Sequence, residues 1–492
     1  MDYSQFLVMH QEIGLLVLIL LVFLFDTFSS RPAPKGFTMF TVCLFGLLTA
    51  LGFVFPIDKQ VASAFGGMYV TSPVMIGIKN VLNIGVFIVI LQSIKWADSE
   101  FMRVRRGEFY ELLLITLFGM YLMISARHFL LFIIGLETAS LPLAALVAFD
   151  KNRYESHEAA VKYILTAVFS SAIFMMGLSF VYALSGTLYF SDVAASIVDG
   201  GVLLIVAIAF VIGGMGFKLS LVPFHLWTAD VYQGAPTSVT SYLSVISKGA
   251  AAFAFFVILV QVFGPFYNGI WEWMLYALII LTITIGNLFA LRQKNLKRFL
   301  AFSSISQAGY IMLGVIAGSA QGLGSLIFYI LVYIFSNLAA FGVISAIENK
   351  TGRVDMDDYN NLYSTNPKLA FTMMLAMFSL AGIPPFAGFF SKFFIFTSAV
   401  APGTPALYIL VLIALINTII SLYYYLLVVK AMFINNQQEC VIPAFRSASS
   451  ERVAMWICVA GIILVGVVSC IYNGLIDASV ANPEYIFTMF AN

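Results

Sequence analysis

The chain has 492 residues, of which 61% are hydrophobic and only 10% are charged, and its net charge is +1. Soluble domains carry about 25% charged residues, so this composition excludes a soluble globular protein and predicts a membrane protein with many spans. The near-zero net charge identifies no partner, because the charges are sorted by membrane side, and we expect no nucleic-acid partner.

The cysteines and the known nucleotide motifs exclude several kinds of site. Cys43, Cys440, Cys458 and Cys470 are scattered in or near apolar runs without CxxC spacing, so we expect no disulfide framework, no zinc and no iron–sulfur cluster on this chain. No glycine-rich dinucleotide fingerprint and no P-loop is present in the sequence, and we therefore expect no bound cofactor. The first apolar run lacks a cleavage site and is followed by further spans, which indicates a retained helix rather than a signal peptide.

Fourteen apolar runs are long enough to cross roughly 30 Å of hydrocarbon. The separation of the fourth run from the fifth depends on reading Arg127-His128 as a turn. The loops are short and leave no room for a soluble domain, so the predicted fold is all-α and polytopic. The runs fall near residues 8–27, 36–56, 75–94, 110–127, 129–149, 157–184, 201–228, 236–263, 272–291, 299–318, 321–348, 368–400, 405–434 and 452–475.

The basic residues predict how the chain is oriented. Of the 25 lysines and arginines, 18 lie in or beside odd-numbered gaps between helices, and three, Lys59, Lys79 and Arg127, belong to even gaps. By the positive-inside rule the odd gaps are cytoplasmic and both termini lie outside. The same rule favours an orientation signal over a docking patch for the basic run 292–298.

The remaining four lysines, Lys162, Lys218, Lys248 and Lys392, fall inside predicted helices, and Glu137 is the clearest acidic companion. Lys162 is closer to a helix end, so it either has a central role or extends to the interface. For the other four residues the alternative is a static ion pair or helix packing. Because ionisable groups inside membranes are by default functional hypotheses, we favour ion chemistry.

Two predicted helices contain breaks. Pro223 interrupts helix 7 soon after Lys218, and Pro384-Pro385, followed by Gly388, interrupts helix 12. Proline removes a backbone donor, and freed backbone groups at membrane depth must face protein or water. Broken helices at corresponding positions of two halves are typical of ion sites in inverted repeats, and a separation of five helices suggests two five-helix units. Lys392 is predicted in the outer half of the membrane, shielded by aromatic neighbours, Phe389, Phe390, Phe393 and Phe394.

Polar side chains near helices 10 and 11 recur at helical spacing. Two interpretations are equally favoured: packing between helices, or a wire of ordered water. They are Ser303, Ser304, Ser306, Gln307, Tyr329, Tyr333, Ser336 and Asn337. His225 either extends such a wire or has a structural role. Burial favours the neutral form of a lysine, whereas a nearby carboxylate favours the charged form. Glu137 and Lys218 are thus predicted as a switchable pair, with Lys248 as a central relay and Lys392 as the far element of a proton path that transfers no electrons.

Four segments also resemble a known family over essentially the whole chain. They are FKLSLVPFHLWTADVYQGAPTSVTSYLSVISK, GLETASLPL, RFLAFSSISQAGY and SLAGIPPFAGFFSKFFIF, and they are similar to the antiporter-like membrane subunits of respiratory complex I. The VYQGAPTSVTSYLSVISK segment, a lysine rather than a glutamate on helix 12 and the lack of a long C-terminal extension favour the N branch over the L and M branches.

The resemblance implies the fold and the site. It implies fourteen helices, with helices 4–8 and 9–13 as inverted repeats and helices 7 and 12 discontinuous. The segments would be a three-helix part (1–109), two repeats (110–265 and 266–436) and a C-terminal helix (437–492). The proton path would comprise Glu137, Lys162, Lys218, Lys248 and Lys392, supported by Pro223, His225, Gln307, Pro384 and Pro385. Gln307 stands where some relatives have histidine, so a titratable step there is not implied.

The resemblance further implies a proton-translocating subunit of a bacterial inner-membrane NADH–quinone oxidoreductase with no redox site of its own. NAD, FMN, iron–sulfur clusters and quinone would bind to partner subunits. The partners would be other membrane subunits, the lipid bilayer and, indirectly, the peripheral redox arm. Two alternatives remain: a subunit of a Mrp-type sodium/proton antiporter, and a structural membrane subunit whose buried charges are inert.

Overall fold

The structure, a computed structural model, describes residues 3–29, 36–54, 61–197, 201–266, 270–434 and 440–480. Within these residues, 13 helices are long and apolar enough to cross a membrane. Two shorter apolar helices, α16 (Pro367–Ala381) and α17 (Ala387–Val400), together make one further span. This confirms the predicted all-α fold of about fourteen spans. The predicted positions of both termini and of Lys59 lie outside the described residues.

Eleven of the spans are single helices, and their bounds follow the apolar runs of the sequence. They are α1 (His10–Phe28), α2 (Gly36–Val54), α3 (Pro73–Ala97), α4 (Arg106–Ser125), α5 (Phe129–Val147), α6 (Tyr154–Ser185), α12 (Ile270–Ala290), α13 (Leu296–Ile316), α14 (Ala320–Thr351), α18 (Pro405–Phe433) and α19 (Ser449–Val467).

The other three spans are composite. Helix 7 consists of α8 (Gly201–Leu219) and α9 (Leu226–Gly234), and helix 12 of α16 and α17. Helix 8 alternates between α and π geometry through α10 (Thr237–Tyr242), η2 (Leu243–Ser247), α11 (Lys248–Val257) and η3 (Ile258–Val262). The short connecting elements are η1 (Tyr3–Met9), α7 (Phe190–Ser196), η4 (Gly264–Phe266), η5 (Met356–Tyr359), α15 (Leu362–Thr365), α20 (Ser469–Val480) and the strands β1 (Ala62–Ala64) and β2 (Tyr69–Thr71).

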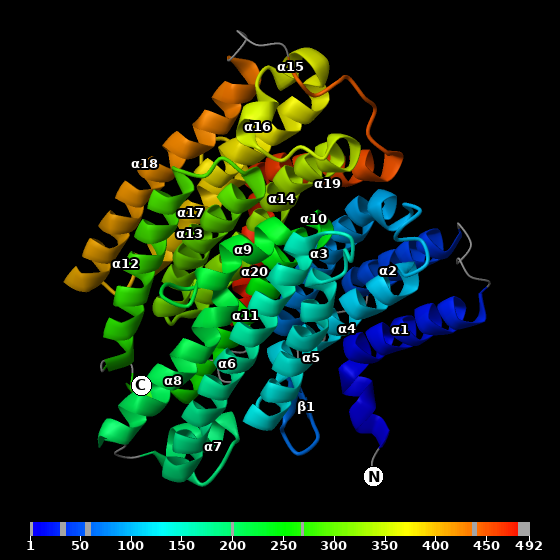
Figure 1. Ribbon diagram of the computed structural model, residues 1–492. Helices are drawn as coiled ribbons and strands as arrows, with labels where there is room; N and C mark the ends of the chain where they lie inside the picture. The colour runs from blue at the N-terminus through cyan, green and yellow to red at the C-terminus, as the bar shows by residue number, and fades with distance from the viewer. Residues whose placement is uncertain are drawn as a thin grey trace.

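The core of the bundle is formed by α13, α14 and helix 8. The apolar windows of these three spans are entirely buried inside the chain, whereas those of α1 and α2 are mostly exposed. Helix α14 packs against α3, α13, α16, α17, α19 and α20. Figure 1 shows α1 and α2 at one edge of the bundle and α12 and α18 at the opposite edge. A polar side chain on α13, α14 or helix 8 therefore has little access to lipid.

A β-hairpin, which the apolar pattern did not predict, covers one end of α4. Its strands pair antiparallel, with Ala62 opposite Thr71 and Ala64 opposite Tyr69. The carbonyl of Met68 in its turn accepts a hydrogen bond of 2.9 Å from the Arg127 amide nitrogen. The hairpin thus closes the bundle beside the short α4–α5 turn, which confirms the predicted division between the fourth and fifth spans.

The helix breaks lie where the prolines predicted them, in helices 7 and 12. These are the fourth spans of the sets 4–8 and 9–13. Pro223, Pro384 and Pro385 are themselves exposed on the isolated chain, but the prediction concerned the freed backbone groups, which were expected to face protein or water. The prolines have no N–H group that needs an acceptor, whereas the carbonyls before the second break turn inward. The division of the chain at residues 109, 265 and 436 stays a prediction.

The prediction of one continuous helix 14 over 452–475 was wrong, because α19 ends at Val467 and α20 begins at Ser469. Gly466 packs directly on the backbone of the helix 12 break, and a Cβ there would lie 2.8 Å from the Ala387 nitrogen. Tyr472 of α20 then stacks on Phe394 of α17, with ring centroids 3.5 Å apart. The turn between α19 and α20 therefore lets the end of the chain pack along helix 12.

Candidate functional site

Lys218 occupies the last turn of α8, where the helix 7 break begins. The break is held by hydrogen bonds to neighbouring groups: the Val222 amide donates to the Thr282 hydroxyl of α12 at 3.0 Å, and the Trp227 indole donates to the Phe217 carbonyl at 3.2 Å. Lys218 is only 7% exposed. Its ammonium is therefore fixed in the protein interior by a well-anchored turn.

Lys218 and Glu137 do not form a contact pair. Lys218 Nζ and Glu137 Oε1 are both buried, and neither has a hydrogen-bond partner among the described residues. No carboxylate of the described residues lies within 4.0 Å of Lys218 Nζ, although the Glu137 charge is near enough to interact with it electrostatically. The two groups thus interact electrostatically without a direct contact.

Further unpartnered polar atoms surround the same break. Buried polar groups in proteins are nearly always satisfied by protein or by ordered water. A cluster of atoms with no protein partner in the described chain is therefore typical of a hydrated interior. These atoms are Tyr163 Oη, Ser220 Oγ, His225 Nδ1, Thr228 Oγ1 and Tyr232 Oη.

Lys162 lies apart from this interior. Its side chain is 40% exposed and pairs with Asp230 at 2.6 Å and with Glu158, one turn earlier on α6, at 2.8 Å. Asp230, on α9, also pairs with Arg298 of α13 at 2.6 Å. The structure therefore places Lys162 in a half-exposed charge network that ties α6 to α9 and α13.

Lys248 lies at the centre of the bundle. It begins α11 directly after the π-helical turn η2, and π turns occur often at functional sites. Its Nζ donates a hydrogen bond of 2.7 Å to the Ser304 hydroxyl of α13 and lies 5.5 Å from the ring centroid of Tyr232. His225 is within electrostatic range. In the described chain Lys248 has no carboxylate within 4.0 Å.

Lys392 forms hydrogen bonds across the break of helix 12. From α17 its Nζ donates to the carbonyls of Leu380 and Ala381 at 2.9 and 3.0 Å, the last residues of α16 before Gly382 turns to a φ of 86°. The ring centroid of Tyr310 lies 5.3 Å away. The ammonium thus binds the negative end of a half-helix dipole, and only 5% of the residue is exposed.

A hydrogen-bonded chain on α13 leads from Lys248 toward Lys392. Ser303, next to the Lys248 partner Ser304, contacts the Tyr425 hydroxyl at 2.6 Å. Gln307 donates to Tyr425 at 3.1 Å and to the Leu380 carbonyl, one of the two carbonyls bound by Lys392, at 3.4 Å. Gln307 also accepts from Tyr329. Gln307 and Lys392 therefore share the Leu380 carbonyl as an acceptor.

Further polar groups of helix 8 lie between Lys248 and the surface where odd-numbered gaps meet. A cavity of about 380 Å³ there is lined by Asp150, Arg153, Thr237 and Glu348, among others. Thr237 donates to the Glu348 carboxylate. From helix 8, Ser244 then accepts from Asn337 of α14 at 2.7 Å. A line of polar groups thus runs along helix 8 from this cavity toward Lys248.

Glu348 also ties three spans together. Arg153 pairs with it at 2.8 Å, and Lys297 at 3.5 Å while donating to the Ala235 carbonyl at 2.9 Å. Partial burial would lower the pKa of Arg153, but the hydrogen bond and charge of Glu348 outweigh it, so this pKa lies above its usual value. Lys297 and Arg298 thus have internal partners, which the orientation interpretation of the basic run missed.

A buried ion pair in the first three spans was also missed. Lys79 of α3 and Glu12 of α1 are both 1% exposed and lie 2.5 Å apart. Lys79 also donates to Ser125 at 2.8 Å, and Glu12 accepts from Tyr69 at 2.8 Å. Lys79 is therefore a fully paired interior residue rather than a loop charge. An acidic residue inside an apolar run was the signal in the sequence, for Glu12 as for Glu348.

Two features bear on cofactors. Among the described residues, no three His, Cys, Asp or Glu side chains lie together in a way that would hold a metal ion. The cysteines of the described segments are free thiols.

The chain is similar to known membrane proteins over nearly its whole length. The family described as "NADH:quinone oxidoreductase/Mrp antiporter, TM" matches residues 126–421. The NADH-quinone oxidoreductase subunit N of Azobacteroides pseudotrichonymphae is 54% identical over 96% of this chain and 98% of the relative. The protein of the same name from Phocaeicola vulgatus is 53% identical over 98% of this chain and 100% of the relative.

Solved structures agree with these relatives. A chain of respiratory complex I from Thermus thermophilus with bound Aureothin is 32% identical, with a TM-score of 0.78 over 93% of this chain and 96% of that chain. A chain of the Mrp complex from Dietzia sp. has a TM-score of 0.84 over 99% of this chain and 98% of that chain, at 20% identity. The second likeness concerns the fold alone.

The Glu12–Lys79 pair generates a stability prediction. Removing one partner of a buried ion pair leaves an uncompensated charge and costs about 3–5 kcal/mol, whereas replacing both is much milder. Glu12→Gln and Lys79→Met should each lower the unfolding midpoint in detergent, and the double variant should recover most of the loss. Lys95→Met, near the end of the same helix and without a carboxylate partner in the described chain, serves as the control. Additive losses in the double variant would contradict the pairing.

Proposed function

Because the chain belongs to the subunit N group of the NADH–quinone oxidoreductase/Mrp antiporter membrane family, we propose that it moves protons across the membrane within a bacterial NADH–quinone oxidoreductase. In this proposal NAD, FMN, iron–sulfur clusters and quinone are bound by partner subunits. This chain converts a conformational or electrostatic signal from them into proton movement. Other membrane subunits of the complex are its neighbours in the bilayer.

The observation that carries the proposal is a contrast among the buried lysines. Lys79 has a carboxylate at 2.5 Å, as expected for a static structural charge. Lys218, Lys248 and Lys392 have none within 4.0 Å in the described chain. A permanent unpaired ammonium in a dry interior is costly, and such a group neutralises instead. Three buried lysines of this second kind suit groups that gain and lose protons.

The polar contacts between these lysines support a route. The helix 8 line leads from the surface cavity to Lys248, and the Ser303–Tyr425–Gln307 chain leads on toward Lys392. Hydroxyl groups both donate and accept hydrogen bonds, so a proton passes along them when water completes the gaps. The glutamine amide at Gln307 orients this chain without titrating. The contacts favour a hydrogen-bonded wire over simple packing of these side chains.

The gap between Glu137 and Lys218 supports the switching role. Both groups have buried atoms without a hydrogen-bond partner in the described chain, and their electrostatic interaction changes with separation and hydration. Lys162, being half-exposed and paired with Asp230 and Glu158, takes part at the periphery of the path.

Sequence similarity weighs against the rival activities. The relatives at 53–54% identity are oxidoreductase subunits, whereas the Mrp complex chain is only 20% identical. A purely structural role would not explain why Lys218, Lys248 and Lys392 lack a carboxylate within 4.0 Å in the described chain.

Orientation is the first testable part of the proposal. The odd gaps, with most of the basic residues, face the cytoplasm, and both termini face the periplasm. A tag placed at the C-terminus should be accessible to protease in intact spheroplasts. A tag protected there and cleaved only in inverted vesicles would overturn the orientation.

The Glu137–Lys218 pair makes the second prediction. Lys218→Ala should lower coupled proton translocation about tenfold or more, as expected when a proton-transfer group is lost, while the complex still assembles. Glu137→Gln should have a similar effect, and Glu137→Asp should retain part of the activity. The measurement is proton uptake by inverted vesicles driven by NADH, with exposed Lys350→Ala as the control. Full pumping by an assembled Lys218→Ala complex would reduce the pair to helix packing.

Lys392 makes the third prediction. Lys392→Ala should impair pumping because it removes the donor to the Leu380 and Ala381 carbonyls as well as the titratable group. Lys392→Arg keeps a donor but stays protonated at any working pH, so it should support assembly and still pump poorly. Proton yield is compared with NADH–quinone activity in proteoliposomes. A wild-type proton yield in the arginine variant would show that a fixed charge suffices and exclude deprotonation at this site.

A further inference from the structure

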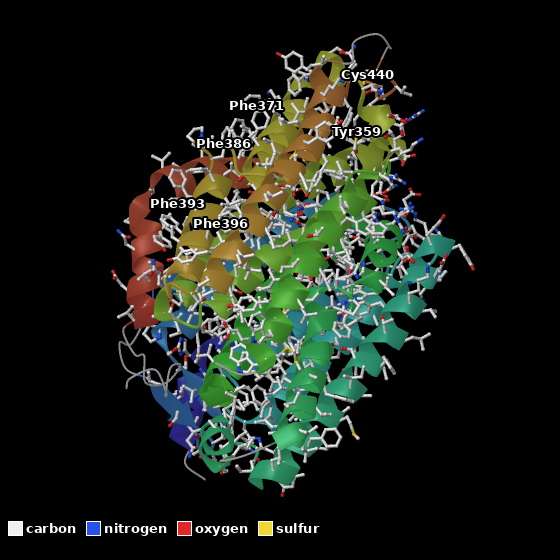
Figure 2. The ribbon with its side chains drawn as sticks, turned by 90° about the vertical axis from the view of Figure 1, so that its left-hand side faces the viewer. Tyr359, Phe371, Phe386, Phe393, Phe396 and Cys440 are labelled. Carbon is white, nitrogen blue, oxygen red and sulfur yellow. The ribbon has the colours of Figure 1, made fainter. Side chains whose placement is uncertain are left out.

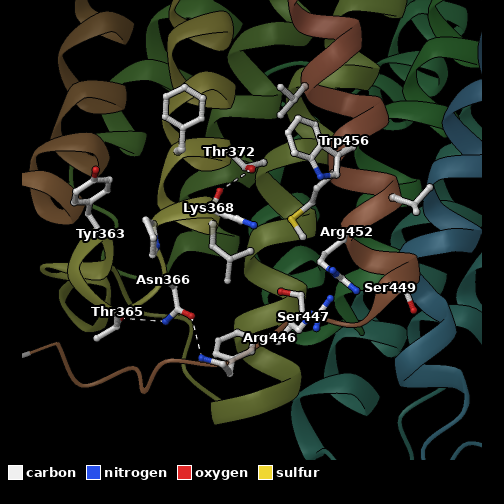
Figure 3. Close-up of a pocket in the computed structure, with 17 residues that line it drawn as sticks. Tyr363, Thr365, Asn366, Lys368, Thr372, Arg446, Ser447, Ser449, Arg452 and Trp456 are labelled. Atoms are coloured by element: carbon white, nitrogen blue, oxygen red, sulfur yellow. Dashed lines mark hydrogen bonds between the residues drawn. The ribbon is translucent and has the colours of Figure 1, made fainter.

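A groove of about 1000 Å³ lies between α16 and α19, at the end of the bundle where both helices begin. Figure 3 shows its walls, formed by the first turns of the two helices and by the segment that leads into α19. Its lining residues belong neither to the lysine path nor to the Glu348 network. The groove is therefore a separate feature of the surface.

The groove is rich in positive charge. Lys368 in the first turn of α16, Arg452 in the first turn of α19 and Arg446 before α19 all line it, and the lining contains no acidic side chain. Within the described residues none of the three has a carboxylate within 4.0 Å. Figure 3 shows Lys368 and Arg452 directed into the space between the helices, with Arg446 beside Arg452. Three cations thus share one cavity without a counter-charge from these residues.

Glu451, the acidic residue next to Arg452 in the chain, forms its hydrogen bonds outside the groove. Glu451 is only 1% exposed, accepts a hydrogen bond from the Ala448 amide at 3.0 Å and lies 3.4 Å from the Asn349 amide of α14. It therefore caps the start of α19 on the inner side. The amino-terminal ends of α16 and α19 both meet at the groove, and their dipoles add to its positive potential.

The part of the groove that lies further along the two helices is apolar. Phe371 lies one turn beyond Lys368, and Val453 and Trp456 lie on the first two turns of α19. These three side chains are 50%, 50% and 68% exposed. Figure 2 shows Phe371 projecting from the same outer surface as Phe386 and Phe393 of helix 12. The groove thus opens onto an outer surface of the bundle that carries aromatic side chains.

The groove is therefore cationic where the helices begin and apolar one or two turns further along. A phospholipid has the matching order, with an anionic headgroup followed by apolar acyl chains. Helices 12 and 14 begin on the same side of the membrane, so the three cations lie at one membrane surface and the aromatic residues one or two turns below it. We propose that this groove binds an anionic phospholipid, with its phosphate among Lys368, Arg446 and Arg452 and an acyl chain along Phe371 and Trp456.

Two other occupants fit less well. A free phosphate uses the cations but leaves the exposed apolar wall uncovered, whereas a lipid satisfies both. A protein partner that buries three cations needs acidic side chains in register with them, and neighbouring Phe371, Val453 and Trp456 resemble an interfacial belt, where tryptophan is enriched. Each basic residue near a membrane surface attracts anionic lipid by about fivefold, so three together provide selectivity on the order of a hundredfold.

The test uses the purified complex and a phosphatidylglycerol with a photoreactive acyl chain. The groove variant combines Lys368→Gln, Arg446→Gln and Arg452→Gln. The control variant removes three exposed charges from odd-numbered gaps elsewhere, Arg292→Gln, Lys294→Gln and Lys350→Gln. Labelled peptides are located by mass spectrometry, with unlabelled phosphatidylglycerol, phosphatidylcholine or inorganic phosphate as competitors.

The proposal expects labels on the first turns of α19 and on α16 in wild type and control. The label should be displaced by phosphatidylglycerol at roughly a hundredth of the phosphatidylcholine concentration. It should be lost in the groove variant, whose assembly is checked by its NADH–quinone activity. Trp456→Ser, which keeps the cations, should weaken retention of the lipid.

Three outcomes would overturn the assignment. Equal labelling of α19 in wild type and groove variant would show that the cations do not select the lipid. Displacement by millimolar inorganic phosphate alone would identify a free-anion site. Finally, a cysteine at Val453 that cross-links in the membrane to another subunit would identify a protein interface.

Discussion

The fold depends on the cost of keeping an ammonium group in a dry interior. A lysine inside a membrane protein needs a carboxylate, other hydrogen-bond acceptors or water, because the surrounding hydrocarbon provides none of them. Lys79 has a carboxylate and lies in a closed cluster beneath the β-hairpin. Lys248 has a serine hydroxyl, Lys392 has two backbone carbonyls, and Lys218 Nζ has no hydrogen-bond partner among the described residues. The buried lysines thus differ in their contacts: Lys79 and Lys297 each pair with a carboxylate, whereas Lys218, Lys248 and Lys392 have none within 4.0 Å in the described chain.

The long apolar runs and the two proline breaks could be predicted from the sequence, because span length and the missing proline donor are local properties. Intramembrane Lys218, Lys248 and Lys392 could be identified for the same reason. The pairing of Glu12 with Lys79 could not, since it joins residues 67 positions apart and depends on how α1 packs against α3 and α4. Similarly, Lys297 was interpreted as a loop charge, because the sequence does not show that α13 and α14 bring it within 3.5 Å of Glu348.

The turn between α19 and α20 also could not be predicted from the sequence, in this case for the course of the backbone. Nothing in the run 452–475 distinguishes a straight helix from two helices, because the turn contains no proline. It arises where Gly466 meets the backbone of Ala387, so tertiary packing decides it. The exposed prolines make a related point. Freed backbone groups were predicted to face protein or water, and groups at both breaks have protein partners although the proline rings are exposed: the Val222 amide donates to Thr282, and the carbonyls before the second break accept from Lys392.

The hydrogen bonds of Lys392 have a consequence for how a signal reaches it. A charged lysine carries three N–H donors, and two of them reach the Leu380 and Ala381 carbonyls. A neutral amine keeps two N–H groups, which is the number that these carbonyls require. The side chain can therefore change its charge while helix 12 keeps the same shape. In the proposed function, a change of charge at Lys392 therefore requires no displacement of the α16 carbonyls that it binds.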